Sequence, residues 1–363
     1  MILSQESAKY LKELCEQSMK LKLAQKDKMT PDRTVFINLL SGISTCRRCP
    51  GIDTNMGYES VYKCEKEENK KLTLKFMKEA YGVDSEDSFK KALGQFSANT
   101  DFRDFYNVWN NYPASFIAKL DGDTLEGFNK CKDFAEELSK YTGSKGFLAW
   151  DINEQIGLLR RAYACDIIGE KLFNEVADSY WKIAIDYFDS WGEYAISCVC
   201  GAAYWEYKYS RFDIKKTESF IKLNTEIAQS LMEKDGCWGR FCWPTTNTEK
   251  PAIHPSKMVL MMPDEYRGAY GCIMSKKVYV DGEKVNVAKR QEPNPKYLDV
   301  DTGWIIGSGN ESNEYLDNPD NMGIVDLNTA CNYAPELVDL FMENPNCPAL
   351  YVRDENGKFV KRQ

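Results

Sequence analysis

Apolar side chains recur every three or four residues through the first two thirds of the chain, a spacing typical of amphipathic helices. Capping residues and glycines divide this stretch into separate segments. The pattern predicts helices over residues 30–40, 59–81, 85–96, 121–140, 146–168, 170–189, 190–210 and 213–233. Residues 1–243 are therefore predicted to form an all-α domain.

Local signals at the helix ends support this division. Thr30-Pro31-Asp32 is predicted to supply an N-cap, a proline at the first helical position and an acid in the first turn. Gly82 is predicted to end a helix, because glycine adopts the left-handed backbone without strain. Ser190-Trp-Gly-Glu193 has the pattern of a capping box, in which the two polar residues satisfy N–H groups at the helix start reciprocally.

The pattern changes at Pro244. Residues 244–256 are polar and contain three prolines, so they are predicted to be a linker. Beyond it, short apolar runs predict strands at 269–275, 303–307, 323–325 and 350–352, a hairpin over 278–285 with an Asp-Gly turn, and a helix at 334–342. Residues 257–363 are therefore predicted to form a small α+β domain, and the chain to be a multidomain protein.

Negative charge is concentrated in this second domain. The whole chain has 47 Lys and Arg against 55 Asp and Glu, which gives a net charge of −8. Between Tyr297 and Val352 there are ten acids and no Lys or Arg. This stretch therefore carries −10, and the rest of the chain carries +2.

Three interpretations of the acidic stretch are open. It can bind a basic partner surface through electrostatic steering and charge-assisted hydrogen bonds. It can also be a solvated loop that only promotes solubility. A calcium site is the third, although residues 314–320 lack the ligand order of an EF-hand loop.

Composition excludes several classes of function. The negative net charge argues against general binding to nucleic acid or to anionic membranes. The longest nearly apolar run, residues 195–205, is shorter than the roughly 20 residues that span a bilayer. The N-terminus lacks the pattern of a signal peptide, so a cytoplasmic protein is predicted. His254 is the only histidine, which excludes a metal site built from several imidazoles.

The thirteen cysteines are predicted to be free thiols, because their number is odd and their spacing is irregular. Cys46-Arg-Arg-Cys49 is the one Cys-x-x-Cys pair, and a redox or zinc role for it stays open. No Gly-x-Ser-x-Gly, P-loop, dinucleotide-binding glycine pattern or His-Glu-x-x-His motif is present. No cofactor, metal or catalytic residue is therefore predicted.

Two groups of motifs resemble known families. The first group comprises Gly146-Phe-Leu-Ala-Trp150-Asp151, Arg160, Tyr163, Gly169, Ser190-Trp-Gly-Glu-Tyr194, Gly201 and Tyr204-Trp205. It resembles the helical family called domain of unknown function 1266, over about residues 70–243. Glu154 stands where this resemblance implies a basic residue. Asp151 and Arg160 are nine residues apart and so lie on opposite faces of one helix.

The second group lies in the acidic domain. It comprises Gly271-Cys-Ile-Met-Ser-Lys276, Asp301-Thr-Gly-Trp304, Ser308-Gly-Asn-Glu311, Glu314-Tyr-Leu-Asp-Asn-Pro-Asp-Asn321, Val325-Asp-Leu-Asn-Thr329, Asn332-Tyr333 and Arg353-Asp-Glu-Asn-Gly357. It resembles the family called domain of unknown function 2185, also described as immunity protein 33-like, over about residues 265–360. The resemblance implies a bacterial toxin–immunity system, in which an immunity protein binds and blocks its toxin.

Two functions follow as hypotheses. The first is a non-enzymatic immunity-type protein that binds a protein partner, such as a basic toxin, through an acidic C-terminal face. Its predicted binding residues are Asp301, Trp304, Glu311, Asp317, Asp320, Asp326 and Asn328. The alternative is an enzyme of unknown reaction in the helical domain. Its predicted site residues are Trp150, Asp151, Arg160 and Glu193.

Overall fold

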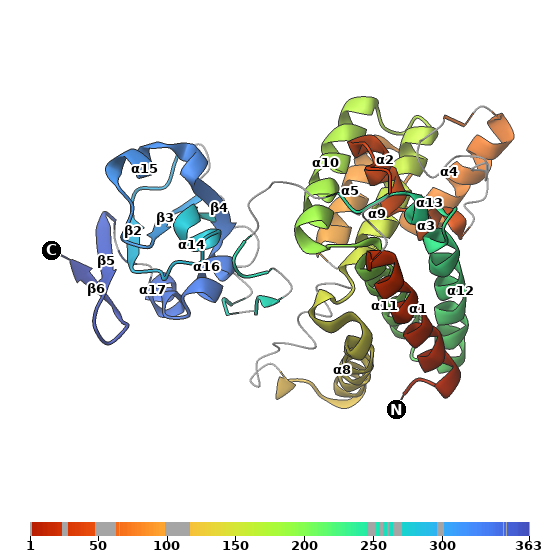
Figure 1. Ribbon diagram of the computed structural model, residues 1–363, viewed down its shortest axis with the longest axis horizontal. Helices are drawn as coiled ribbons and strands as arrows, with labels where there is room; N and C mark the ends of the chain where they lie inside the picture. Colours follow the sequence, from red (N-terminus) through yellow and green to blue (C-terminus); the bar gives the residue numbers. More distant parts are fainter. Residues whose placement is uncertain are drawn as a thin grey trace. The chain divides into compact units, whose positions relative to one another are not determined.

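The computed structural model describes residues 2–23, 28–47, 63–64, 66–98, 117–244, 251–254, 257–259, 261–263, 271–295, 301–343, 345 and 347–362. The chain divides into two compact units, Met1–Thr246 and Asn247–Gln363, each built on its own hydrophobic core. The first unit is helical and the second contains a mixed sheet (Figure 1). The fold class predicted from the sequence is confirmed.

The first unit, called the helical unit below, consists of helices of very different burial. Its elements are α1 (Gln5–Leu23), α2 (Arg33–Leu40), α3 (Gly42–Cys46), α4 (Glu67–Tyr81), α5 (Glu86–Ala98), α8 (Gly122–Thr142), η3 (Gly143–Lys145), α9 (Leu148–Ala164), α10 (Glu170–Tyr187), α11 (Trp191–Tyr209), α12 (Ile214–Met232) and α13 (Cys237–Arg240). In α9, 14 of 17 residues are buried, and in α11 13 of 19 are. These two helices form the centre of the unit.

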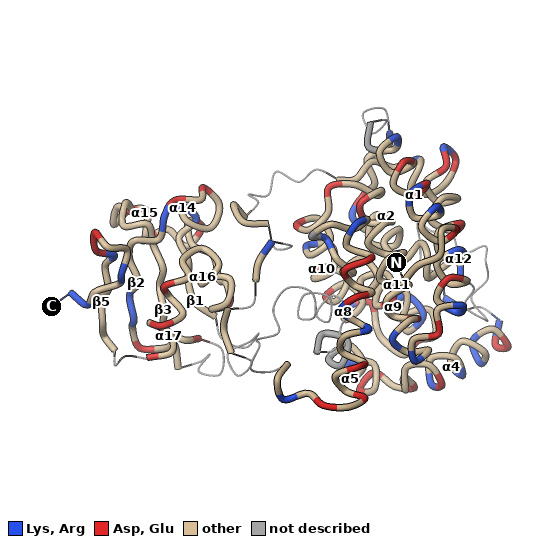
Figure 2. Tube along the Cα trace, turned by 90° about the horizontal axis from the view of Figure 1, so that it is seen from below, with Lys and Arg blue, Asp and Glu red and all other residues tan. Residues whose placement is uncertain are grey.

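The other helices pack around this central pair. Helix α11 contacts α1, α8, α9 and α12, and α9 also contacts α2, α3, α5 and α10 (Figure 1). Small residues on α11 allow close approach: a Cβ added to Gly192 would lie 1.9 Å from Ser18 Oγ, and one added to Gly201 would lie 2.4 Å from Trp150 Cβ. The outer helices carry charges of both signs, as Figure 2 shows along α4.

An aromatic cluster closes the end of α2. Trp191 stacks on Trp238 with ring centroids 5.4 Å apart. Trp238 Nε1 donates to the Leu39 carbonyl at 2.9 Å, and the Tyr194 hydroxyl donates to the Leu40 carbonyl at 2.7 Å. Carbonyls in the last turn of a helix lack intrahelical partners, so these two buried side chains replace water there.

Capping signals located most helix starts, with two shifts. Asp32, and not Thr30, is the N-cap of α2, and its carboxylate accepts from Val35 N–H at 2.8 Å. The helix predicted over 59–81 begins at Glu67; residues 59–62 lie outside the described residues, and Lys63 and Cys64 are not helical. At Gly82 the backbone is left-handed, with φ +68°, as predicted for a helix end.

The second unit, called the sheet unit below, contains six strands in the order β4-β1-β3-β2-β5-β6. Its elements are β1 (Gly271–Ser275), α14 (Lys276–Tyr279), β2 (Val287–Arg290), β3 (Asp301–Gly307), α15 (Asn313–Asp317), η6 (Pro319–Asn321), β4 (Met322–Asp326), α16 (Leu327–Tyr333), α17 (Leu337–Glu343), β5 (Ala349–Arg353) and β6 (Phe359–Arg362). β1 and β3 are parallel, and the remaining neighbours are antiparallel.

Helices cover one face of this sheet. Side chains alternate between the faces of a strand, and the set that includes Met274, Trp304 and Ile306 packs against apolar residues of α14, α16 and α17. The opposite set faces away from these helices. We call this second side of the sheet the open face.

The hairpin predicted over 278–285 is wrong. Val278 lies in α14 and is fully buried, while Gly282, with φ +74°, follows the end of that helix. An Asp-Gly pair suits a type I′ turn and equally a helix end, because both require a left-handed residue. The strand that pairs in this region is β2, further along the chain.

The helix predicted over 334–342 is also displaced. The structure has two short helices here, α16 and α17, separated around Pro335. The strands predicted at 303–307, 323–325 and 350–352 are confirmed as parts of β3, β4 and β5. The strand predicted at 269–275 is present from Gly271, and residues 269–270 lie outside the described residues.

Part of the predicted linker attaches to the sheet unit. Ala252 N–H donates to the Tyr279 carbonyl at 2.8 Å, and Ile253 N–H donates to the Tyr333 hydroxyl at 3.1 Å. These bonds fix residues 251–254 on the sheet unit, whereas residues 245–250 lie outside the described residues.

Candidate functional site

Two of the predicted binding acids hold loops beside the sheet. Asp301 accepts from the N–H groups of Asn294 and Gly303, both at 2.8 Å. Glu311 accepts from Ser308 N–H at 2.7 Å and from Gly309 N–H at 2.8 Å. Because these carboxylates are used by backbone donors of the same unit, their first role is structural.

The charge on Glu311 is stabilised where it lies. Burial alone would raise the pKa of its carboxyl group, but hydrogen bonds from Ser308 N–H, the Ser275 hydroxyl and Gly309 N–H outweigh burial and lower the pKa below its ordinary value of 4.5. A Cβ on Gly307 would lie 3.1 Å from this carboxylate. Glu311 therefore covers the open face at the end of β3.

Asp326 and Asn328 are occupied in a similar way. Asp326 caps α16 by accepting from Thr329 N–H at 2.9 Å and from its hydroxyl at 2.7 Å. The Asn328 amide accepts from the N–H groups of Met261 and Met262 and donates to the Val259 carbonyl. Asn328 thus fastens the segment before β1 to α16.

Trp304 belongs to the core. Its exposed fraction is 2%, and its ring lies 5.2 Å from Phe341 and 6.1 Å from Tyr351, measured between centroids. Arg290 lies over the same ring at 5.4 Å. A partner cannot reach this side chain without opening the sheet unit, so its proposed role as an exposed anchor is dropped.

The remaining predicted acids are exposed. Asp317 ends α15 and Asp320 lies in η6, and neither element contains a buried residue. Glu314 in α15 is also exposed. We call residues 313–321 the acidic segment; it leads directly into β4. A basic residue nearby is Lys277, whose Nζ lies 5.2 Å from the centroid of the Tyr315 ring.

An apolar row crosses the open face beside this segment. Residues paired between neighbouring strands point to the same face, and the pairings place six residues in one row: Ile324, Ile273, Ile305, Lys289, Leu350 and Arg362. Ile324 is 86% exposed and Leu350 is 39% exposed. The row is apolar at β4, β1 and β3, and basic residues occur at β2 and β6.

In the helical unit, the predicted site residues lie apart from one another. Trp150 is 3% exposed, and the Arg47 guanidinium lies over its ring at 4.6 Å. Arg47 also pairs with Glu154, to whose carboxylate Asn153 donates at 2.7 Å. The acid at position 154 therefore has a specific basic partner on α3's C-terminal side.

Asp151 and Arg160 extend in different directions from α9. Asp151 is 6% exposed and, after burial, is the second cause that raises the pKa of Tyr180 on α10. Arg160 is 3% exposed, and its Nη1 donates to the Ser41 hydroxyl at 2.8 Å, the Thr45 hydroxyl at 3.0 Å and the Asn38 carbonyl at 3.2 Å. The two charges face different neighbouring helices.

Glu193 stabilises the start of α11. Ser190 Oγ accepts from Glu193 N–H at 3.1 Å, which is half of the predicted capping box. The Glu193 carboxylate accepts from Asp189 N–H at 3.1 Å, and not from Ser190 as the pattern implies. Lys145 Nζ lies 3.6 Å from the same carboxylate.

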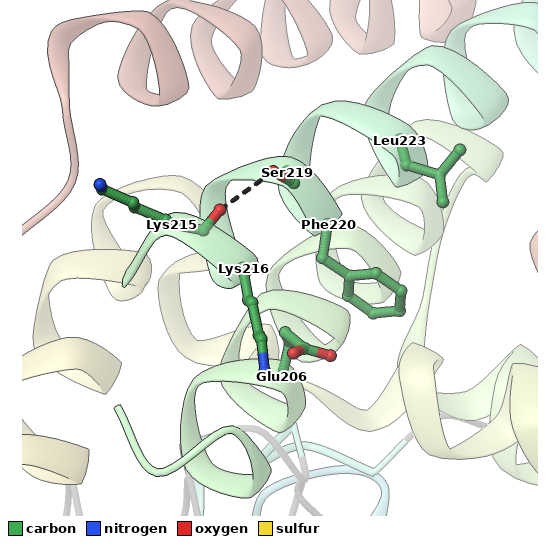
Figure 3. Close-up of a pocket in the computed structure, with 6 residues that line it drawn as sticks. All are labelled: Glu206, Lys215, Lys216, Ser219, Phe220 and Leu223. Atoms are coloured by element: carbon green, nitrogen blue, oxygen red, sulfur yellow. Dashed lines mark hydrogen bonds between the residues drawn. The ribbon is translucent and has the colours of Figure 1, made fainter. Parts of the chain in front are cut away.

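A surface pocket of about 410 Å³ lies between α11 and α12 (Figure 3). It is lined by Glu206, Lys215, Lys216, Ser219, Phe220 and Leu223. Ser219 donates to the Lys215 carbonyl at 3.0 Å, so its hydroxyl serves the helix itself. None of the four residues predicted for an enzyme site lines this pocket.

The twelve described cysteines are free thiols. Cys49 lies outside the described residues, so the Cys46–Cys49 pair stays a prediction. Within the described residues, no group of three or more His, Cys, Asp and Glu side chains could hold a metal ion. No helix in that part of the chain is both long and apolar enough to span a membrane.

These features define the class of each unit: a helical unit with buried polar residues on its central helix, and an α+β unit with an acidic, partly apolar surface. Comparison with known families identifies both. Residues 272–363 match the family described as Immunity protein Imm33 domain, and residues 77–243 match the family described as Protein of unknown function (DUF1266). Searches of curated proteins and of solved structures returned no match.

The two suspected resemblances are therefore confirmed in their positions. The C-terminal match carries the Imm33 name instead of the name domain of unknown function 2185. The chain is thus of immunity type in its sheet unit. Sequence reasoning missed Ile324, because an isoleucine in a predicted strand is usually buried, and only the strand order shows that β4 is outermost.

Proposed function

We propose that this protein is an immunity protein that binds a basic protein toxin through the acidic segment of its sheet unit. The observation that carries the proposal is the match of residues 272–363 to an immunity domain. The exposure of Glu314, Asp317 and Asp320 supports it, because these acids are not used by the fold's own backbone donors in the way Asp301 and Glu311 are.

The expected contribution of these acids is mainly kinetic. Exposed charges that complement a partner raise the association rate, whereas their pairs are screened beyond a Debye length of about 8 Å at physiological salt. Asp301, Glu311 and Asp326 add to the local negative potential while they hold the loops and α16. The helical unit serves as a scaffold or as a second contact in this proposal.

The test begins with purification of the full-length chain from its native cells and identification of the proteins that accompany it. An identified partner is then expressed alone and together with the chain, and cell growth is measured. An immunity protein should restore growth, and it should bind the purified partner with an association rate that falls as salt rises.

The decisive variant is Asp317→Lys combined with Asp320→Lys. We expect an association rate about tenfold lower at low salt and a weaker salt dependence. The matched control is Asp339→Lys combined with Glu355→Lys, which makes the same change in net charge at exposed positions of α17 and the β5–β6 turn. If both double variants bind like the parent, with unchanged salt dependence and unchanged protection of growth, the acidic segment is not the binding surface.

A further inference from the structure

The two edges of the sheet are built differently. β6, at one edge, carries Lys361 and Arg362, and charged residues of this kind discourage another strand from pairing. β4, at the other edge, has the sequence Met-Gly-Ile-Val-Asp, with no basic residue and no proline. Its central residue, Ile324, is 86% exposed, the largest fraction among the exposed large hydrophobic residues described.

An unprotected edge of this kind offers two recognition elements. Edge strands present backbone N–H and C=O groups that are free to pair with an added strand. Beside them, the apolar row that begins at Ile324 and continues through Ile273 and Ile305 lies on the open face. An added strand would place every second side chain next to this row.

Charge determines which strand fits. Asp317 and Asp320 precede β4, and Asp326 ends it. If a second copy of the chain paired at this edge, the same acids would come together from both copies, and like charges placed opposite each other are destabilising. A basic segment meets these acids with the opposite charge. The edge therefore favours a basic strand over self-association.

We propose that an extended basic segment of the protein partner pairs with the free edge of β4 as a seventh strand. Its backbone bonds to β4, its apolar side chains contact Ile324, and its basic side chains lie near Asp320 and Asp326. This inference rests on the proposed function and specifies how the same surface binds.

The experiment uses the full-length chain and synthetic seven-residue peptides. The probe is the capped peptide Lys-Val-Lys-Val-Lys-Val-Lys, and the charge control is its Glu-for-Lys counterpart. Hydrogen exchange is followed by mass spectrometry at about 1 mM peptide. We expect exchange at residues 322–326 to slow about tenfold with the basic peptide, and to stay unchanged with the acidic one.

Chain variants separate the edge from the rest of the surface. Ile324→Lys places the same kind of residue on β4 that β6 already carries, and it should abolish the slowing. Val360→Lys is the matched control, because it makes the same charge change on β6, where residue 360 is 46% exposed. It should leave the slowing at β4 intact. Circular dichroism of both variants checks that the fold is retained.

Backbone pairing is tested on the peptide itself. Only alternate residues of a strand bond to a given neighbour, so N-methylation of one alternate set should abolish the effect, and N-methylation of the other set should preserve it. Equal binding by both methylated peptides, or slowing that persists in Ile324→Lys, would overturn the proposal. Absence of any slowing with the basic peptide would also overturn it. If β4 is protected but the chain fails to restore growth against its partner, the edge inference stands and the immunity function fails.

Discussion

Arg160 decides whether the buried charges of α9 stabilise the helical unit or form a site. Its guanidinium is 3% exposed and donates to the Asn38 carbonyl and to the hydroxyls of Ser41 and Thr45. The change to test is Arg160→Ala. It removes the donor from three buried acceptors that lie at the junction of α2 and α3.

The cost can be worked out from these contacts. Each buried acceptor left without its donor costs about 1 kcal/mol, for a total of about 3 kcal/mol. The lost stem contains two methylene groups beyond Cβ, worth about 0.8 kcal/mol each. The free energy of unfolding of the helical unit should therefore fall by about 4–5 kcal/mol. At 2–4 °C per kcal/mol for a unit of this size, its melting temperature should fall by about 10–15 °C.

The assay is calorimetry of the full-length chain, with the helical signal followed in parallel by circular dichroism. Arg160→Lys should recover part of the loss, because an ammonium group supplies donors without the planar geometry of a guanidinium. Lys222→Ala, at an exposed position on α12, is the control and should change stability by less than about 0.5 kcal/mol. A loss below about 1 kcal/mol in Arg160→Ala would refute the structural role and return Arg160 to the candidates for a site.

Three further predictions concern other parts of the chain. Gly192→Ala should destabilise the helical unit by about 1–3 kcal/mol in chemical denaturation, because the new Cβ would meet Ser18, and adding Ser18→Gly should recover stability; equal stability of the single variant and the parent would contradict the close packing of α1 and α11. Cys165 should resist alkylation by iodoacetamide in the native protein at pH 8, because burial first, and then Cys64, raise the pKa of its thiol to about 12, so the thiolate is scarce until the pH approaches that value; labelling as fast as in the unfolded chain would refute this. Glu311 contributes stability above its unfolded pKa because its folded pKa is lowered, and this stability is lost as the pH falls below about 4.5, so Glu311→Gln should flatten the acid limb of the sheet unit's stability curve; an unchanged acid limb would exclude the role.

Capping chemistry made the helical unit predictable from the sequence. Caps act through hydrogen bonds within three or four residues, so Asp32, Ser190 and Gly82 marked helix ends correctly to within two residues. The same local logic misplaced the hairpin near Gly282. An Asp-Gly pair satisfies two different local structures, and the burial of Val278 in the core selected the helix.

The acidic face was predictable as a concentration of charge, but its division into two roles was not. Backbone donors from Asn294, 301–309 and α16 reach Asp301, Glu311 and Asp326, and these donors are arranged by the fold of the sheet unit. Asp317 and Asp320 remain exposed on short elements without buried residues. Sequence position alone does not distinguish these two groups.

The sequence by itself therefore determined the helical and α+β units, the family relationships and the location of the negative charge, because these depend on local spacing and composition. Only the tertiary structure decided that Trp304 is buried, that Arg160 bonds to α2 and α3, and that Ile324 lies on an outermost strand. The physical reason is that burial and edge position depend on which distant segments pack together. Strand order is set by pairing between residues as far apart as Cys272 and Val325, and no local pattern encodes that pairing.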